Sequence, residues 1–441
     1  MKNTTIKNTK KSVINKIKNV KTSFSAEKIT NYAGLSLVAK YINKVGLIEE
    51  WEKMFPTIKY NATKFSTSQV LMAFVFGFMS GVHRISRISR FTQDDLVKTL
   101  LQLPTRINKD ALSTHLKRMG EKGAEKLRRF HLSFNNRLLK KSGLTSITLD
   151  ADSTYLLTYG HQEGAEKSYH PKKKGHRTYH PLLVFLSELK ILYHSRFRKG
   201  STYTSVGIVE LLKEIKAGLP GQVKKVFFRA DSGFFSLETI HFIESIPGWT
   251  YLIKFSAKNL KNKLAQLDWQ PIEGQKNMWQ CTFEYTFSRN KGKMVIKAIR
   301  TLVKEEERDF FDKKELVPVY EYAAYASNLE LDPYDLHKKY TQRATSETWI
   351  EQVKSQLMAG KTLTNQFAAN DILWQLSVWA YNISIMMRWG VKKFWKWEHN
   401  TFRYLLLQVA GKVVKSGRQC YLKMSRFYLY KDDWLKLEEA I

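Results

Sequence analysis

The spacing of apolar positions changes along the chain and separates helical regions from a mixed one. Between residues 26 and 142 apolar residues recur every three or four positions, which predicts helices. From 143 to 257 short runs rich in branched and aromatic residues alternate with an amphipathic stretch at 205–217. This alternation predicts a mixed α/β sheet.

The predicted sheet is interrupted before the pattern returns to helix. Strands are expected at 146–152, 181–186, 190–196, 223–230 and 251–255. Residues 258–335 contain short alternating runs such as MWQCTFEYTF, which are typical of a β-rich insertion. The pattern is helical again from 336 to 390 and from 391 to 441. The expected fold is therefore multidomain, with a helical N-terminal region, an α/β core with a β-rich insertion, and a helical C-terminal region.

The net charge of the chain predicts a class of binding partner. The 441 residues include 73 Lys and Arg against 40 Asp and Glu, which gives a formal net charge of +33. A field of this sign attracts polyanions, so nucleic acid is the first partner to expect. Residues 1–25 form a basic arm with seven lysines, and 105–141 holds eleven Lys or Arg against three acids. Within the latter, NKDALSTHLKRM is similar to the second helix of a helix-turn-helix.

Other features argue against several classes of protein. Two cysteines, Cys281 and Cys420, are too few for a disulfide framework or a cysteine-based zinc site. The most apolar run, at 70–82, is too short to cross a bilayer. A cytoplasmic protein without a membrane partner is expected.

The stretch TLDADST at 148–154 places two carboxylates one residue apart at the end of a predicted strand. Residues two apart in a strand face the same side, so Asp150 and Asp152 would repel each other unless a cation or solvent relieves them. Asp231 directly follows the apolar run KVFFRA, in an equivalent place. Functional groups collect at the carboxyl ends of strands in α/β sheets, so all three aspartates are candidates for chemistry.

A further carboxylate lies on a predicted helix in KYTQRATSETWIEQVKSQL. Tyr340, Arg343, Glu347 and Lys354 are separated by three, four and seven residues, which places them along one helical face. Three carboxylates suit Mg²⁺, which prefers oxygen ligands. Two such ions about 4 Å apart would stabilise an in-line displacement at phosphorus.

These motifs resemble the DDE transposases of bacterial insertion sequences, in the branch with a Y-(2)-R-(3)-E-(6)-K signature. That signature is matched without a gap by Tyr340, Arg343, Glu347 and Lys354. LDADST with the following YGHQEG resembles the first acidic block, TYHPLLVF an aromatic-proline-leucine strand, and FFRADSGF the second acidic block. NQFAANDILWQLSVWAYNI resembles the helix after the glutamate. The resemblance covers roughly residues 25–400.

The resemblance implies a ribonuclease-H-like core and gives the acids different roles. The catalytic and metal-binding residues that it implies are Asp152, Asp231 and Glu347. They would hold two Mg²⁺, for which Mn²⁺ is expected to substitute. Asp150 becomes a neighbour that raises the pKa of Asp152 or helps to hold the second ion. The residues expected to grip the backbone of the transposon ends are Tyr340, Arg343 and Lys354.

The domain organisation expected from pattern and resemblance together has six segments. They are a basic arm (1–25), a helical DNA-binding region (26–142), the first part of the ribonuclease-H-like core (143–257), the β-rich insertion (258–335), the second part of the core with the glutamate helix (336–390), and a basic helical region (391–441).

Histidines allow a rival interpretation of one segment. His161, His170, His176 and His180 crowd together in the sequence, and a zinc site is conceivable. The YGHQEG block already accounts for the first of them, and the run KKKGHR is interpreted more simply as a basic loop against the DNA backbone. The DNA contacts expected there are Lys172, Lys173, Lys174 and Arg177.

The expected function is that of a DNA transposase that binds the ends of an insertion sequence, cuts phosphodiester bonds with two divalent metal ions, and joins the freed 3′ hydroxyl to target DNA. Double-stranded DNA is the expected partner, a homodimer the synaptic species, and the bacterial nucleoid the location. Two alternatives stay open: a catalytically silent transposase-derived DNA-binding protein, and a ribonuclease-H-like nuclease without strand transfer.

The assignment of the acids predicts the behaviour of four alanine variants. Asp152→Ala, Asp231→Ala and Glu347→Ala should each abolish cleavage while binding of the DNA ends is retained, because they remove metal ligands and not the basic surface. Asp150→Ala should only weaken cleavage. Cleavage of labelled transposon ends and gel-shift binding measure the two properties. An inactive Asp150→Ala beside an active Asp152→Ala would show that the motif is assigned wrongly.

Overall fold

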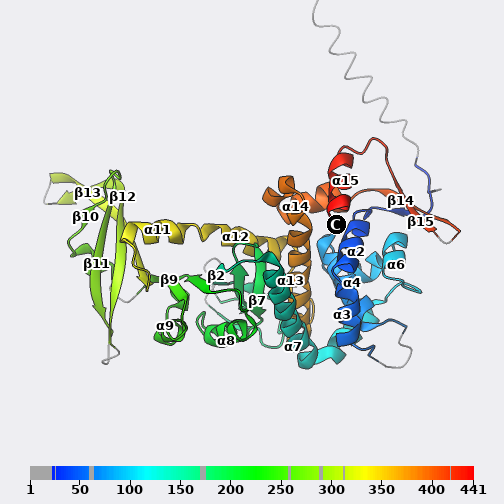
Figure 1. The fold of residues 1–441 in the computed structure, drawn as a ribbon, viewed down its shortest axis with the longest axis horizontal. Helices are drawn as coiled ribbons and strands as arrows, with labels where there is room; N and C mark the ends of the chain where they lie inside the picture. The colour runs from blue at the N-terminus through cyan, green and yellow to red at the C-terminus, as the bar shows by residue number, and fades with distance from the viewer. Residues whose placement is uncertain are drawn as a thin grey trace, which may run out of the picture.

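The structure is a computed structural model that describes residues 22–24, 26–58, 64–168, 175–256, 260–287, 292–310, 313–417 and 419–441. The described part is elongated: a central sheet lies between the β-rich insertion at one end and the helical regions at the other (Figure 1). Most of the predicted basic arm lies outside the described residues, as do Lys172, Lys173, Lys174 and His170.

The N-terminal region is helical, as its apolar spacing predicts. Its helices are α2 (Leu35–Lys44), α3 (Leu47–Met54), α4 (Thr67–Met79), α5 (Ile85–Phe91), α6 (Asp95–Leu100) and α7 (Lys109–Ser142). A capping box starts α4, in which Ser66 Oγ accepts the Gln69 N–H and Gln69 Oε1 accepts the Ser66 N–H. This most apolar segment is buried on nearly all sides, and among the described residues no helix is long and apolar enough to cross a membrane.

A bend divides α7 into two parts. Gly120 has φ 54° and ψ −156°, a backbone conformation that side chains with a Cβ rarely adopt. The segment NKDALSTHLKRM, which resembles a helix of a helix-turn-helix, forms the part before the bend. The part after the bend packs against α13 and the sheet.

The central sheet is mixed, in agreement with the strands expected from the sequence. Its order is β10-β11-β12-β13-β9-β8-β2-β6-β7. The core strands are β2 (Ser146–Ser153), β6 (Leu182–Leu186), β7 (Ile191–Arg196), β8 (Lys225–Ala230) and β9 (Trp249–Phe255), and the insertion strands are β10 (Gln270–Pro271), β11 (Met278–Thr286), β12 (Lys293–Phe310) and β13 (Lys313–Ser327). β2, β8 and β9 run parallel, while β6, β7 and the insertion strands pair in antiparallel fashion.

Smaller elements surround these strands. β3 (Leu156–Leu157), β4 (Glu166–Lys167) and β5 (Arg177–Tyr179) form a separate small sheet. The helices between and after the core strands are α8 (Ile208–Gly218), α9 (Leu237–Glu244) and α10 (Leu260–Ala265). The insertion strands join the central sheet through the pairing of β13 with β9, so the insertion extends the core sheet.

The C-terminal region contains β-structure that the sequence did not predict. Its helices are α11 (Pro333–Thr341), α12 (Ala344–Glu351), a π-helix (Gln352–Gln356), α13 (Phe367–Trp389), a 3-10 helix (Lys392–Lys396), α14 (His399–Phe402), a second π-helix (Arg403–Leu407) and α15 (Lys431–Ala440). The expectation of helix throughout 391–441 is wrong, because β14 (Gly411–Ser416) and β15 (Gln419–Met424) form a hairpin. β1 (Ile29–Thr30) pairs with β14, so a segment far away in the sequence stabilises the hairpin.

The long helix α13 joins the helical region to the sheet. Trp379 packs against Trp51 and Phe130, with ring centroids 5.7 and 5.4 Å apart. Farther along the chain, Asn382 is fully buried and its amide pairs with the backbone of Leu192 in the edge strand β7. Its Oδ1 accepts the Leu192 N–H at 2.9 Å and its Nδ2 donates to the Leu192 carbonyl at 2.9 Å. The Asn382 side chain thus satisfies the backbone hydrogen bonds of Leu192 at the edge of the sheet.

Asn382→Ala should destabilise the protein by about 1–3 kcal/mol, because the buried Leu192 N–H of β7 would lose its partner. The Leu192 carbonyl would keep a second donor, Asn135 Nδ2 at 3.1 Å. The measurement is the free energy of unfolding in urea. Asn43→Ala, at an exposed position of α2, is the matched control and should change it little. Equal stability of the two variants would show that Asn382 does not hold the sheet edge.

Candidate active site

Asp152 and Asp231 lie at neighbouring strand ends on one edge of the sheet. β2 and β8 are parallel with Ala151 opposite Ala230, so the two aspartates follow at the same level. Asp231 caps the short 3-10 helix that follows it, because its Oδ1 accepts the N–H two residues later at 3.0 Å. The negative charge of Asp231 reaches Asp152 and contributes to raising its pKa. The structure therefore brings together two of the three predicted metal ligands.

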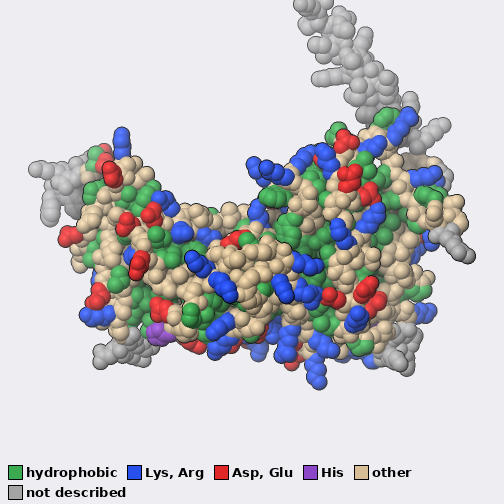
Figure 2. All heavy atoms as spheres, in the orientation of Figure 1, with side chains coloured by type: hydrophobic (Ala, Val, Ile, Leu, Met, Phe, Trp, Pro, Cys, Tyr) green, Lys and Arg blue, Asp and Glu red, His purple; other side chains and the backbone are tan. Residues whose placement is uncertain are grey.

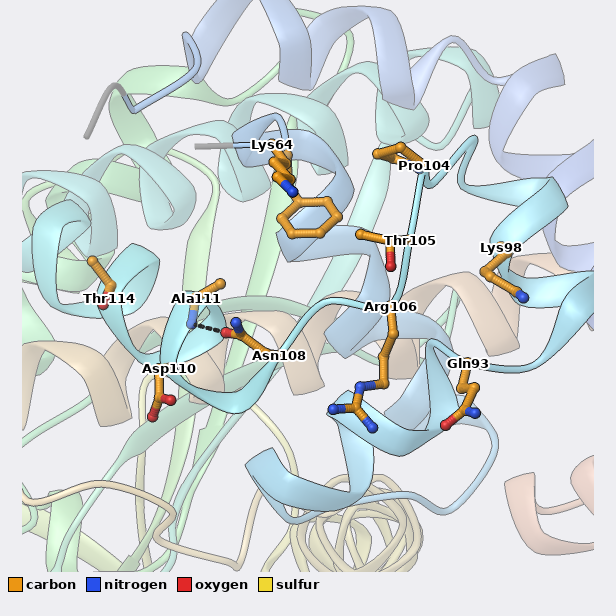
Figure 3. A pocket seen from close by; sticks show the side chains of 11 residues that line it. Lys64, Gln93, Lys98, Pro104, Thr105, Arg106, Asn108, Asp110, Ala111 and Thr114 are labelled. Atoms are coloured by element: carbon orange, nitrogen blue, oxygen red, sulfur yellow. Dashed lines mark hydrogen bonds between the residues drawn. The ribbon is translucent and has the colours of Figure 1, made fainter. Parts of the chain in front are cut away.

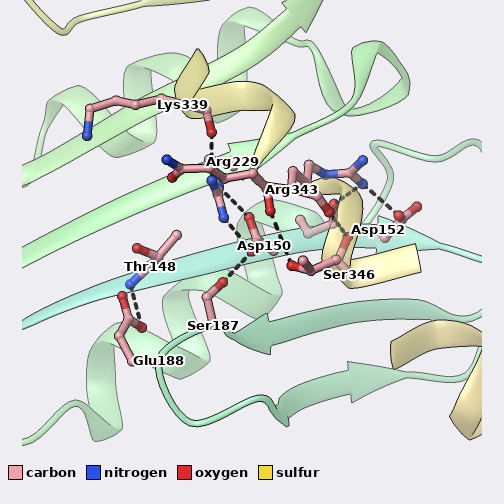
Figure 4. A network of polar contacts seen from close by, with 12 residues as sticks. Thr148, Asp150, Asp152, Ser187, Glu188, Arg229, Lys339, Arg343 and Ser346 are labelled. Atoms are coloured by element: carbon pink, nitrogen blue, oxygen red, sulfur yellow. Dashed lines mark hydrogen bonds and ion pairs between the residues drawn. The ribbon is translucent and has the colours of Figure 1, made fainter. Parts of the chain in front are cut away.

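Burial is the main influence on Asp152 and raises its pKa to about 6. Arg343 opposes this effect, since its Nη2 donates to Asp152 Oδ2 at 2.6 Å. The other oxygen, Oδ1, accepts the Ser153 N–H at 2.7 Å. A buried carboxylate beside a second carboxylate needs a cation to remain charged, and the guanidinium of Arg343 lies in that position (Figure 4).

Asp150 has a different environment, although it is only two residues from Asp152 (Figure 4). It is fully buried and paired with Arg229, with Nε 2.7 Å from Oδ1 and Nη2 2.9 Å from Oδ2. The Ser187 hydroxyl donates a further hydrogen bond to Oδ2. Arg229 also donates to the Lys339 carbonyl at 2.7 Å, which ties α11 to the sheet. With both oxygens engaged, Asp150 is half of a buried ion pair, which argues against a share in the second ion.

Tyr340, in α11, and Arg343, which directly precedes α12, lie beside the two aspartates. Arg343 is buried, and its Nη2 also donates to the Ala151 carbonyl at 2.9 Å. Its Nε is buried with no acceptor among the residues that the structure describes. Burial raises the pKa of Tyr340, and the charges of Asp152 and Asp231 act in the same direction while Arg343 opposes them. These four side chains therefore share one electrostatic environment.

The signature does not lie on one regular helix, as its spacing had suggested. α11 ends at Thr341 and α12 begins at Ala344. At the break the backbone hydrogen bonds join residues three apart instead of four. The Arg343 N–H donates to the Tyr340 carbonyl, and the Arg343 carbonyl accepts from both the N–H and the hydroxyl of Ser346. The expectation of a single helical face is therefore wrong, although Tyr340 and Arg343 still meet at the site.

Glu347 and Lys354 are not brought into this group. Glu347 is exposed on α12, one turn after Arg343. Lys354 is half-buried in the π-helix that follows, and burial lowers its pKa. Throughout the described ranges, no group of three or more His, Cys, Asp or Glu side chains is arranged to hold a metal ion.

Sequence reasoning missed Arg229 and Ser187. Arg229 could have been found from its place near the end of the apolar strand KVFFRA. An arginine buried there needs a buried acidic partner. Nothing in the sequence marked Ser187, because its role depends on the turn between β6 and β7 lying beside β2.

Among the described histidines of the 161–180 segment, His180 has hydrogen-bond partners on both ring nitrogens. His180 is buried, with Nδ1 2.7 Å from the Thr202 carbonyl and Nε2 2.9 Å from Ser153 Oγ. Because a carbonyl only accepts, Nδ1 carries the proton and the Ser153 hydroxyl donates to Nε2. Burial lowers the pKa of His180 to about 4, so the ring is neutral. Of the predicted basic loop, Arg177 is described, and its Nη1 donates to the Ala165 carbonyl at 3.1 Å.

The surface over α11 and α12 is hollowed between the insertion strands and the helical regions (Figure 2). Lys and Arg side chains border this hollow on the helical side (Figure 2). A polyanion is the ligand that such a border attracts.

A second concave region lies at the start of α7. It is an open cleft of about 870 Å³ lined by the cations Lys64, Lys98 and Arg106 (Figure 3). Asn108 Oδ1 accepts the Ala111 N–H at 2.7 Å and so caps α7 at the edge of the cleft. The helical region predicted to bind DNA thus contains a basic cleft.

A mixed sheet with coupled aspartates at parallel strand ends defines an α/β protein, a class in which functional groups collect at the carboxyl edge of the sheet. The chain belongs to the family described as transposase DDE domain group 1, which matches residues 12–441. The resemblance to DDE transposases is thereby confirmed.

Other comparisons are weaker. No curated protein matches the chain. A piggyBac transposase synaptic complex with hairpin DNA shares 13% identity over 87% of this chain and 77% of that chain, with a TM-score of 0.43. The mariner Mos1 paired end complex with Mg shares 14% identity over 46% of this chain and 65% of that chain, with a TM-score of 0.16. The Mos1 strand transfer complex shares 13% identity over 52% of this chain and 78% of that chain, with a TM-score of 0.17. At these TM-scores the likenesses carry no argument about the chemistry of this chain.

Asp150→Ala should lower the free energy of unfolding by about 3–5 kcal/mol, because it leaves the guanidinium of Arg229 buried without its partner. Urea unfolding measures this change. Asp95→Ala breaks a surface pair with Lys98 and should change stability by about 1 kcal/mol or less. If Asp150→Ala kept full stability and yet lost cleavage, Asp150 would take part in the chemistry and not in the fold.

Proposed function

We propose that this protein is a DNA transposase whose chemistry takes place at the sheet edge that carries Asp152 and Asp231. The observation that carries the proposal is the parallel pairing of β2 with β8, which puts two electrostatically coupled aspartates side by side in a chain of the transposase DDE family. The order β7-β6-β2-β8-β9, with an antiparallel half and a parallel half, supports a ribonuclease-H-like core.

The donor set fits divalent metal ions at two of its three positions. Mg²⁺ prefers carboxylate oxygens, and Asp152 and Asp231 supply them at one place. Glu347 is exposed and is not grouped with them. We propose that the two aspartates form the centre of the site and that Glu347 completes it when α12 moves against DNA. Two Mg²⁺, when bound, would activate water and neutralise charge on the phosphate.

Arg343 has a second role in this proposal. Its Nη2 balances the charge of Asp152, while its buried Nε has no acceptor in the described part of the chain. A phosphate oxygen of the transposon end would supply that acceptor, and guanidinium groups suit phosphate geometry. Tyr340 lies in the same environment and would position the same strand. Lys354 would add a point charge one or more turns farther along.

The hollow over α11 and α12 is the proposed path of the DNA, because these helices adjoin Arg343 and the hollow has a basic border on the helical side (Figure 2). The cleft with Lys64, Lys98 and Arg106 would hold a more distant part of the same duplex. The loop residues Lys172, Lys173, Lys174 and Arg177 are proposed as further backbone contacts. A synaptic dimer that pairs two transposon ends is the proposed active species.

The proposed reaction has two phosphoryl transfers. Water attacks a phosphodiester at the transposon end, the bond from phosphorus to the 3′ oxygen breaks, and a 3′ hydroxyl is released. That hydroxyl then attacks a phosphodiester of target DNA or of the opposite strand, a new ester bond forms, and another 3′ oxygen leaves. No covalent protein intermediate is required, so Ser153, whose hydroxyl is committed to His180, is not a nucleophile.

The test is formation of strand-transfer products from labelled transposon ends and target DNA in Mg²⁺. The intact protein should form joined products, and Asp152→Asn, which keeps the volume of the side chain, should form none while still binding DNA. Cleavage without joining would support the nuclease alternative. Binding without cleavage by the intact protein would support the catalytically silent alternative, which the separation of Glu347 from the aspartates makes the specific rival.

A further inference from the structure

A pocket of about 410 Å³ lies away from the catalytic edge, between the β6–β7 turn, the end of α13 and the 3-10 helix Lys392–Lys396. The β6–β7 turn follows Leu186, which pairs with Leu149, three residues before Asp152 on β2. The pocket is therefore separate from the site described above. Its size falls in the range of about 300–1,000 Å³ that small-molecule sites occupy.

A buried cation without a counterion lines this pocket. Arg388 is 3% exposed, its Nε donates to the Ser384 carbonyl at 2.9 Å, and its Nη1 donates to the Trp397 carbonyl. Its Nη2 is buried and has no hydrogen-bond partner within the described chain. The charge of Glu398 reaches Arg388, but that carboxylate accepts from Gln356 and forms no salt bridge with Arg388. A buried guanidinium is costly without an anion, and within the described chain Arg388 is bonded only to backbone carbonyls.

The remaining walls of the pocket are mainly aromatic. Trp389, Phe394 and Trp395 line the pocket, and Trp395 is 54% exposed. The Trp395 indole N–H donates to the Trp389 carbonyl at 3.1 Å, which holds the exposed ring at the opening. The run KKFWKW interleaves lysines with aromatic residues, as in surfaces that bind nucleic acid.

One acid and one base complete the lining. Lys190 Nζ lies 3.5 Å from the Trp395 carbonyl, at the rim. Glu188 is the acid of the lining, and its Oε2 accepts the Thr148 N–H at 3.0 Å. The carboxylate is thereby bound to the backbone, which leaves the buried guanidinium as the group that lacks a partner.

We propose that this pocket binds a nucleotide, with its base against Trp395 and Trp389 and its phosphate held by the charge of the Arg388 guanidinium. Aromatic side chains stack on any base, because every base has a π face. A guanidinium is the strongest side-chain partner for a phosphate group, and burial reduces the screening of its charge. A simple inorganic anion would satisfy the charge but would leave the aromatic wall without a function.

The nucleotide can come from two sources that share this chemistry. One is a free mononucleotide, and the other is an unpaired nucleotide of bound DNA. Only the second rests on the proposed function, since it requires DNA to reach this face of the protein.

Fluorescence of 2-aminopurine, which is quenched by stacking, distinguishes the sources. The full chain is titrated in EDTA with free 2-aminopurine deoxyribonucleoside 5′-monophosphate, and separately with a duplex of unrelated sequence that ends in one unpaired 2-aminopurine nucleotide. Saturable quenching of either probe is expected. Trp395→Ala should weaken the quenched binding by about 5- to 100-fold, and Trp395→Phe should retain most of it.

Arg388→Gln should weaken the same binding at least tenfold, provided that its circular dichroism melting curve remains that of a folded protein. If it does not fold, the pair Trp395→Ala and Trp395→Phe decides. Phe427→Ala, which removes an aromatic side chain that is 80% exposed and outside the pocket, is the control and should bind both probes normally. Asp152→Asn should also retain the quenching, so loss of catalysis does not imply loss of this site. The proposal is overturned if neither probe is quenched, or if Trp395→Ala binds as the intact protein does.

Discussion

Parallel hydrogen bonding between β2 and β8 sets the position of the charged groups at the active edge. The register places Asp150 opposite Arg229 and Ala151 opposite Ala230, and the next residues of both strands are the two coupled aspartates. A slip of one residue would turn each of these side chains to the other face of the sheet. The connection between the strands includes α8, as parallel pairing requires a long crossover.

Two aspartates that are two residues apart on β2 each pair with an arginine, and the two pairs differ in how completely the carboxylate is bonded. Asp150 and Arg229 satisfy each other with two hydrogen bonds, and the pair is closed further by Ser187 and by the Lys339 carbonyl. Asp152 makes one hydrogen bond to its arginine and remains under the influence of Asp231. The first pair therefore joins α11 to the sheet, whereas the second lies beside another carboxylate that raises the pKa of Asp152.

The helix α13 determines how the helical region and the sheet share one core. Its aromatic face packs on α3 and α7 through Trp379, and its amide Asn382 binds the edge strand of the sheet. The same helix ends at Arg388 and Trp389, beside the β6–β7 turn. The pocket proposed to bind a nucleotide is thus built on the rigid junction and not on a loop alone, which is a condition for a pre-formed site.

Much of the fold followed from local pattern. The apolar period predicted the N-terminal helices and the core strands, because amphipathic helices and half-buried strands leave a clear repeat in the sequence. Spacing and residue type also made Asp150, Asp152, Asp231 and Arg343 candidates, and the resemblance to DDE transposases then chose Asp152 over Asp150. The hairpin β14–β15 escaped prediction, since it depends on pairing with β1 from the other end of the chain.

The sequence by itself determined most of the N-terminal helices and core strands and which acids stand at strand ends, because both depend on neighbours within a few residues. Only the tertiary structure decided that Asp150 belongs to Arg229, that the signature is split between α11 and α12, and that Arg388 is buried without an anion. These features depend on the register between strands and on helices packed from far along the chain. Such contacts leave no repeat in the sequence, since the partners are chosen by distance in space.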